Sequence, residues 1–150
     1  MMDISIVKYK TKTAGEEEIF LHLKECNGYF IPPLEKKVNI REYSKKIFER
    51  SVTFEAWADR SLIGLIAAYL NDKENHTGFI TNVSIVKDYK GKGIASALIK
   101  MCFQHSKNTG IDAICLEVSP ENKAAISFYK KTGFTGVENK RDVIVMKLKL

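Results

Sequence analysis

The spacing of hydrophobic residues changes repeatedly along this chain of 150 residues between the period of a strand and that of a helix. Alternating residues and short apolar runs predict strands at 4–10, 52–58, 62–70, 77–86, 112–119 and 143–150, with a hairpin turn at Asp59-Arg60-Ser61 between the second and the third. Apolar residues three and four positions apart predict helices at 14–26, where Asn27-Gly28 marks the stop, and at 39–50, 91–105 and 121–133. The predicted order is β, α, α, β, β, β, α, β, α, β, β, in which one of the last two strands has no range assigned. This order implies an α/β fold with helices packed on the faces of one sheet.

Length and composition favour one globular domain that spans residues 1–150. Hydrophobic residues make up 45% of the chain and charged residues 28%, which is ordinary for such a domain. No segment approaches the roughly 20 apolar residues of a membrane span, so we expect a cytoplasmic protein without a membrane partner. Cys26, Cys102 and Cys115 are far apart in the sequence and predict reduced, buried thiols.

The positive charge of the chain is unevenly distributed. The net charge is +6, and residues 87–150, with 12 basic and 6 acidic residues, hold the whole excess. This excess indicates either an anionic ligand or a solvated face, and it is too sparse to predict nucleic-acid binding. His22, His76 and His105 lack the spacing of metal ligands, so no metal is predicted.

A glycine-rich stretch, DYKGKGIASALIK at 88–100, opens the third predicted helix. Glycine lets a ligand approach the backbone, and the first N–H groups of a helix have no partner, so this terminus is a natural anion site. Lys90 and Lys92 add positive charge beside it. The stretch matches neither the phosphate loop of nucleotide hydrolases nor GxGxxG.

The same stretch, extended to VSIVKDYKGKGIASALI at 83–99, resembles motif A of the GNAT superfamily of acetyl-CoA-dependent N-acetyltransferases, whose signature is R/Q-x-x-G-x-G/A. Lys90, Gly93 and Ala95 occupy the signature positions, and Lys90 departs from the usual Arg or Gln. A second block, LEVSPENKAAISFYKKTGF at 116–134, is similar to the next conserved block of that family. The resemblance implies a mixed, mostly antiparallel sheet of six to seven strands flanked by about four helices.

The resemblance also implies how acetyl-CoA binds. Backbone N–H groups from Gly91 to Ser96 are expected to hold the pyrophosphate, and the strand before them is expected to lie along the pantetheine arm. The residues expected at the donor are Val83, Ser84, Ile85, Lys90, Gly91, Lys92, Gly93, Ile94, Ala95, Ser96 and Asn122. Asn122 also suits the N-cap of the helix that follows it.

Two residues are candidates for the chemistry. Tyr129 matches the family tyrosine that protonates the leaving thiolate, and its alternative is a core tyrosine. Glu117 matches a general base in the branch that acetylates protein N-termini, and its alternative is a salt-bridged glutamate at a strand end. Thr81 and Asn82 stand where many members of the family carry a carboxylate, which leaves Glu117 or Glu55 for that role.

The acceptor pocket is expected around the loop between the first two helices. Its candidate residues are Tyr29, Phe30, Tyr43, Glu55 and Trp57. Core packing is the favoured alternative for the aromatic residues around the loop, and a solvated strand face explains Glu55 and Trp57 equally well. The acceptor itself stays open among an amino sugar, a small amine, an antibiotic and a peptide N-terminus.

The sequence thus predicts an N-acetyltransferase in which a primary amine attacks acetyl-CoA directly in a ternary complex. Cys102 and Cys115 lie in apolar periodic segments, so neither suits a covalent intermediate. The alternative is a catalytically silent acyl-CoA-binding module. The oligomeric state, including a homodimer, stays open.

Overall fold

The structure, a computed structural model, describes residues 6–150. Within that range the strands are β1 (Lys8–Thr11), β2 (Val52–Ala58), β3 (Ser61–Asp72), β4 (Thr77–Ile85), β5 (Ala113–Val118), β6 (Thr135–Asn139) and β7 (Ile144–Lys149). The α-helices there are α1 (Glu16–Cys26), α2 (Ile40–Arg50), α3 (Ile94–Asn108) and α4 (Lys123–Thr132). Short 3₁₀ turns are η2 (Asn27–Tyr29), η3 (Leu34–Lys36) and η4 (Lys87–Tyr89).

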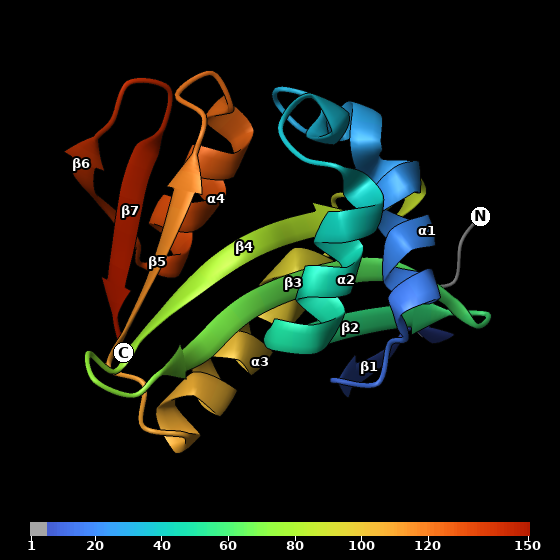
Figure 1. Ribbon diagram of the computed structural model, residues 1–150, viewed down its shortest axis with the longest axis horizontal. Helices are drawn as coiled ribbons and strands as arrows, with labels where there is room; N and C mark the ends of the chain where they lie inside the picture. Colours follow the sequence, from blue (N-terminus) through green and yellow to red (C-terminus); the bar gives the residue numbers. More distant parts are fainter. Residues whose placement is uncertain (1–5) are drawn as a thin grey trace.

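These strands form one mixed sheet in the order β1-β2-β3-β4-β5-β7-β6 (Figure 1). Neighbouring strands are antiparallel except β4 and β5, which are parallel. Because β4 and β5 run in the same direction, the chain must cross over between them, and α3 makes that crossover. The predicted α/β class and the mostly antiparallel sheet are confirmed.

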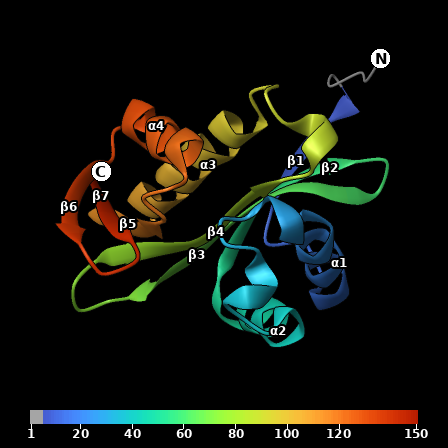
Figure 2. The same ribbon diagram turned by 90° about the horizontal axis from the view of Figure 1, so that it is seen from above.

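Helices cover both faces of the sheet. Figure 2 shows α1 and α2 on one face and α3 and α4 on the other. The interior strand β3 contributes to both hydrophobic cores, because Leu65 packs in the cluster under α1 and α2, whereas Ile66 packs in the cluster under α3. Each side chain is fully buried, which contributes about 1.5–3 kcal/mol to the hydrophobic stabilisation.

Local signals in the sequence account for the ends of several elements. Helix α1 carries three glutamates in its first turn, at the positive end of the helix dipole. The β2–β3 hairpin turns at Asp59 and Arg60, which both have positive φ, as a two-residue turn of type I′ requires. Helix α4 ends at Gly133, whose φ of 111° is in the left-handed region.

Two predicted strand positions differ from the structure. The first strand, predicted at 4–10, runs from Lys8 to Thr11, and Ile4 lies outside the described residues. The seventh strand, which the sequence did not locate, is β6, whose residues are all exposed at the edge of the sheet. An exposed edge strand needs no apolar alternation, so the hydrophobic pattern does not reveal it.

In residues 6–150 no helix has the length and apolar character needed to cross a membrane. No cluster of three or more His, Cys, Asp or Glu side chains in that range is arranged to hold a metal ion.

Candidate active site

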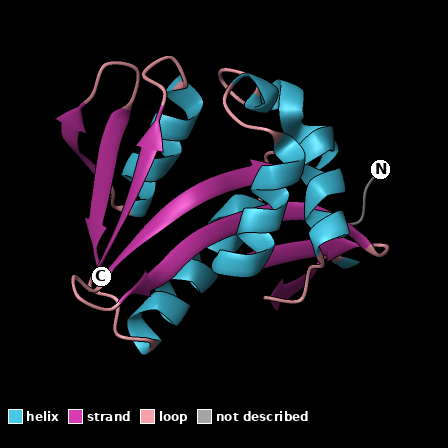
Figure 3. Cartoon of the chain, in the orientation of Figure 1, coloured by secondary structure: helices cyan, strands magenta, loops and turns pink. Residues whose placement is uncertain are grey.

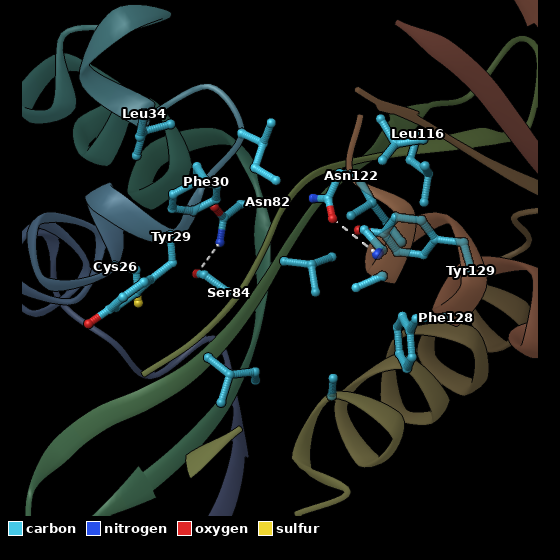
Figure 4. Close-up of a pocket in the computed structure, with 18 of the residues that line it drawn as sticks. Cys26, Tyr29, Phe30, Leu34, Asn82, Ser84, Leu116, Asn122, Phe128 and Tyr129 are labelled. Atoms are coloured by element: carbon cyan, nitrogen blue, oxygen red, sulfur yellow. Dashed lines mark hydrogen bonds between the residues drawn. The ribbon is translucent and has the colours of Figure 1, made fainter. Parts of the chain in front are cut away.

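The site begins where two parallel strands separate. Among the described residues, β4 and β5 pair only over Thr77–Ile80 and Ala113–Leu116, and beyond this short ladder they diverge (Figures 1 and 3). A cavity of about 650 Å³ occupies the opening, within the usual range for small-molecule sites. The α1–α2 connection, β4, the start of α3, β5 and α4 line it (Figure 4).

A β-bulge at Thr81 marks the point of divergence. Asn82 pairs with Ala67 of β3 and Ile80 pairs with Ala68, so Thr81 is the extra residue. The bulge changes which face the following side chains occupy. Ile80 packs in the core under α3, whereas Ser84 contacts His22 of α1. Beyond the bulge, the polar side chains of β4 therefore face the α1–α2 side.

The free edge of β4 presents backbone groups to the cavity. Val86 donates its N–H to the Ile63 carbonyl of β3 at 2.8 Å. Because the direction of backbone groups alternates along a strand, Val83 and Ile85 direct their N–H and C=O groups to the open edge. Val83, Ser84 and Ile85 all line the cavity, as predicted for the donor site.

The glycine turn has the geometry of an anion site. Gly91 and Gly93 have φ of 74° and 81°, and, apart from the adjoining residues of the chain, no described atom lies within 4 Å of a Cβ added at either residue. Glycine is therefore needed for the backbone conformation, and a side chain there would project into free space. Helix α3 follows directly, and among the described residues neither a side-chain cap nor an acidic first turn occupies its start.

The first backbone hydrogen bond of α3 runs from the Ala97 N–H to the Gly93 carbonyl. The N–H groups of Ile94, Ala95 and Ser96 are therefore available to a ligand at the positive end of the helix dipole. Lys90 lies beside them, with its Nζ 4.6 Å from the centre of the Tyr29 ring. Lys92 is exposed and is not among the described residues that line the cavity.

Tyr129 lies on α4, where it packs in the core and also reaches the cavity. Its ring packs edge to face against Phe128 and Phe134, with ring centres 5.6 and 5.8 Å apart, and only 9% of the residue is exposed. It also lines the cavity (Figure 4). Burial raises the pKa of Tyr129 to about 12, so the hydroxyl stays protonated at neutral pH.

Asn122 is the N-cap of α4. Its Oδ1 accepts a hydrogen bond from the Ala125 N–H at 3.1 Å, drawn in Figure 4, and the residue lines the cavity. The cap fixes the orientation of the amide, so Nδ2 is the group left to donate to a ligand.

Glu117 stands near the end of β5 and lines the cavity. Its Oε2 accepts a hydrogen bond from Lys140 Nζ at 3.2 Å, and 38% of its side chain is exposed. The predicted strand-end ion pair and the predicted position at the cleft therefore occur together.

Glu55 and Trp57 are not among the described residues that line the cavity. Glu55 is fully buried and accepts hydrogen bonds from the N–H groups of Thr13 and Ala14 and from Trp57 Nε1. Burial alone would raise the pKa of Glu55, but the hydrogen bonds together lower it. Its carboxylate ties the connection before α1 to β2, and the solvated face considered for β2 does not exist because α1 and α2 cover it.

The α1–α2 connection forms the wall opposite α4. Tyr29, Phe30 and Tyr43 line the cavity there, as predicted. The wall also contains residues that the sequence analysis did not select, namely Cys26, Ile31, Pro32, Leu34, Lys37 and Val38. The paired prolines and the apolar residues beside them identify this loop in the sequence. The sequence does not show that these side chains face the cavity.

A buried polar chain, which sequence reasoning missed, connects this wall with β4. His22 Nδ1 lies 2.8 Å from the Leu62 carbonyl, and its Nε2 lies 2.8 Å from Ser84 Oγ. Asn82 Nδ2 donates to the same Ser84 Oγ at 2.8 Å. Asn82 and Ser84 line the cavity, whereas His22 lies behind them with 3% exposure.

The geometry therefore defines a class of protein: a mixed sheet opened between two parallel strands, with an anion-binding helix start on one side and a general-acid candidate on the other. Residues 16–134 match the Acetyltransferase (GNAT) family. The chain belongs to this family, and the predicted membership is confirmed.

Relatives agree with this assignment. The chain is 34% identical over 102 residues to N-alpha-acetyltransferase 30 of Schizosaccharomyces pombe, an alignment that covers 61% of the chain and 67% of that protein. It is 28% identical over 134 residues to an uncharacterised N-acetyltransferase of Methanocaldococcus jannaschii, covering 85% of the chain and 59% of that protein. The chain thus spans about three fifths to two thirds of these curated relatives.

The fold is also similar to that of solved structures. The PaiA N-acetyltransferase of Thermoplasma acidophilum, crystallised in complex with coenzyme A, superposes with a TM-score of 0.77 at 17% identity. The match covers 95% of this chain and 99% of that one, so the whole architecture is shared.

Proposed function

We propose that the protein is an acetyl-CoA-dependent N-acetyltransferase in which a primary amine attacks the thioester directly in a ternary complex. The observation that carries the proposal is the cavity between β4 and β5, which joins an anion site at the start of α3 to a buried, protonated Tyr129. Family membership and the similarity to N-alpha-acetyltransferase 30 support transfer to an amine.

The donor site fits acetyl-CoA in charge and in shape. The free N–H groups of Ile94, Ala95 and Ser96, together with Lys90, suit the pyrophosphate. The open edge at Val83 and Ile85 suits the amide groups of the pantetheine arm, and Asn122 Nδ2 lies on the opposite side of the opening. Acetyl-CoA supplies the activated acetyl group, and a backbone N–H of β4 polarises the thioester carbonyl.

Tyr129 is the proposed general acid. A hydroxyl that stays protonated donates to the sulfur as negative charge develops on it, and its packing against Phe128 and Phe134 restricts its position. Glu117 is the proposed general base. It accepts a proton from the acceptor ammonium directly or through water, and its contact with Lys140 and its exposure favour the route through water.

Direct attack is favoured because the thiol at the cavity is unreactive. Burial raises the pKa of the Cys26 thiol to about 12, so little thiolate forms at neutral pH. His22 Nε2 lies 3.8 Å from Cys26 Sγ, but it already contacts Ser84 Oγ. Burial also lowers the pKa of His22 to about 4, so the imidazole stays neutral and does not stabilise a thiolate.

The first test is isothermal titration of acetyl-CoA into the wild type and into the Gly93→Glu variant. Binding that the variant loses supports the donor site, because the substitution places a negative charge at the N-cap of α3. Release of CoA thiol with a panel of primary amines then separates an enzyme from a silent acyl-CoA-binding module. Absence of acetyl-CoA binding by a folded wild-type protein would refute the proposal.

A further inference from the structure

We propose that the acceptor is a primary amine bearing an apolar group and no second positive charge, and that Asn82 Oδ1 receives an N–H of that amine. This inference rests on the proposed function and specifies its acceptor. It starts from a buried polar atom. Asn82 is 4% exposed, and among the described residues its Oδ1 has no hydrogen-bond partner. The oxygen itself is covered by neighbouring side chains and lies beside Phe30 in Figure 4, so a ligand in the cavity reaches it when Phe30 moves aside. Because buried polar atoms are rarely left unpaired, this oxygen points to such a ligand.

The orientation of the Asn82 amide follows from the chain of hydrogen bonds behind it. The Leu62 carbonyl only accepts, so His22 Nδ1 carries the proton. The buried imidazole is neutral, and its Nε2 therefore accepts the hydrogen of the Ser84 hydroxyl. Ser84 Oγ then has lone pairs to accept from Asn82 Nδ2.

A flipped amide would place two oxygen atoms against each other without a hydrogen between them. The chain therefore fixes Asn82 with Nδ2 toward Ser84 and Oδ1 away from it, beside Phe30 in Figure 4. An amide oxygen accepts hydrogen bonds and carries no negative charge. It suits an amine N–H and leaves the amine free to lose its proton elsewhere, which the attack on the thioester requires.

The walls around Asn82 define the rest of the acceptor. Phe30, Ile31, Leu34 and Val38 give the α1–α2 wall an apolar surface. Of the described residues that line the cavity, only Glu117 is acidic, and Lys140 already contacts it. A second ammonium group would meet Lys37 or Lys90 and no free carboxylate. Polyamines and aminoglycosides are therefore poor acceptors, whereas an amine beside an aliphatic or aromatic group is a good one.

This chemistry occurs in free monoamines and at the N-terminus of a peptide that begins with an apolar residue. The assay measures release of CoA thiol from acetyl-CoA by the wild type. The apolar acceptors are 2-phenylethylamine, leucine amide and the tetrapeptide Leu-Ala-Gly-Gly, and the comparison acceptors are Ser-Ala-Gly-Gly, lysine amide and spermidine. We expect kcat/KM for the best apolar acceptor to exceed that for spermidine and lysine amide by about tenfold or more. The ratio of kcat/KM for leucine amide to that for Leu-Ala-Gly-Gly shows whether the acceptor is a free monoamine or a peptide N-terminus.

Variants of the polar chain test the contact itself. Asn82→Ala is expected to raise KM for the best acceptor by about tenfold, with the affinity for acetyl-CoA unchanged within about twofold. Ser84→Ala keeps the Asn82 oxygen but frees its rotation, so a smaller rise in KM is expected. Ser44→Ala, which removes a buried hydroxyl from α2 away from the cavity, is the matched control.

Highest activity with spermidine or lysine amide would overturn the inference and leave the proposed function intact. So would an unchanged acceptor KM in a folded Asn82→Ala protein that binds acetyl-CoA. If acetyl-CoA binds but no amine in the panel releases thiol, the proposed function fails, and the inference fails with it. Should Asn82→Ala not fold, the wild-type panel and Ser84→Ala still decide the question.

Discussion

The hydroxyl of Tyr43 donates to the backbone carbonyl of Thr81 at 2.7 Å, and the Tyr43 hydroxyl oxygen also lies 2.7 Å from the Thr81 hydroxyl oxygen. This pair ties α2 to the bulge at which β4 leaves β5. A carbonyl at a bulge has lost its place in the ladder, so a side chain satisfies it instead. One tyrosine thus joins the cavity wall proposed for the acceptor to the strand edge proposed for the donor.

Tyr43→Phe is expected to destabilise the fold by about 1 kcal/mol, because it removes the partner of the Thr81 carbonyl and keeps the ring. Urea unfolding measures the difference. Tyr9→Phe, at an exposed position of β1, is the control and should change stability by less than about 0.5 kcal/mol. Equal effects of the two substitutions would show that the Tyr43 hydroxyl does not hold the bulge.

Gly93→Ala is expected to cost about 1–2 kcal/mol of stability, because φ is 81° and only glycine adopts this region freely. It should also weaken acetyl-CoA binding, since the start of α3 is displaced. Gly28→Ala is the matched control, because a Cβ there meets no described atom within 4 Å and its φ is not positive. Thermal unfolding and calorimetry measure the two effects. Similar losses in both variants would contradict the role of φ.

Tyr129→Phe is expected to lower kcat by about 10²-fold or more while the affinity for acetyl-CoA changes little. The ring keeps its packing, so the fold should survive. Because burial raises the pKa of Tyr129 to about 12, the acid stays protonated, and wild-type kcat should not fall between about pH 8 and pH 10. Stopped-flow detection of thiol release gives both quantities. A kcat within a factor of about two of the wild type would exclude Tyr129 as the acid.

Glu117→Gln and Glu55→Gln are expected to have opposite effects. Glu117 lies at the cavity and is partly exposed, so its substitution should reduce kcat and leave stability nearly unchanged. Glu55 is buried among donors, so its substitution should cost about 2–3 kcal/mol of stability without a direct effect on kcat of the folded protein. Thiol release at saturating substrate measures kcat of each variant, and urea unfolding measures its stability. If Glu55→Gln alone reduced kcat, the base would have to be assigned again.

His22 is expected to make the fold sensitive to mild acid. Burial lowers its pKa from 6.5 to about 4, so the unfolded chain binds a proton that the folded protein does not. The contribution of neutral His22 to the free energy of unfolding is fully present above pH 6.5 and is lost as the pH falls toward 4. By this linkage the protein is about 2 kcal/mol less stable at pH 5 than at pH 7. Urea unfolding at both pH values should show a smaller difference for His22→Gln than for the wild type, and equal differences would refute the account.

The helices could be predicted because their ends carry local signals. The acidic first turn of α1 and the glycine after α4 are read directly from the sequence, and the structure begins and ends these helices there. The family resemblance was also local, since its two motifs are contiguous. A single domain over residues 1–150 stays a prediction, which the sheet shared by β1 and β7 supports.

The burial of Glu55 and the polar chain at Asn82 could not be predicted in the same way. Glu55 alternates with apolar residues as a solvated side chain would, and only the packing of α1 and α2 on β2 makes that face internal. His22 and Ser84 are 62 positions apart, and no periodicity connects them. Contacts of this kind depend on how layers meet, which hydrophobic spacing within one element does not encode.

Because the ladder between β4 and β5 is short, part of the sheet lacks interstrand hydrogen bonds. Within residues 6–150, four residue pairs join the two halves of the sheet, and no strand pairs with the remaining edge of β4. A donor molecule lying along that edge would act as the missing strand and would bridge the two halves. By mass action, any such ligand stabilises the fold that binds it. The stability of the fold is therefore expected to rise with the concentration of the donor substrate.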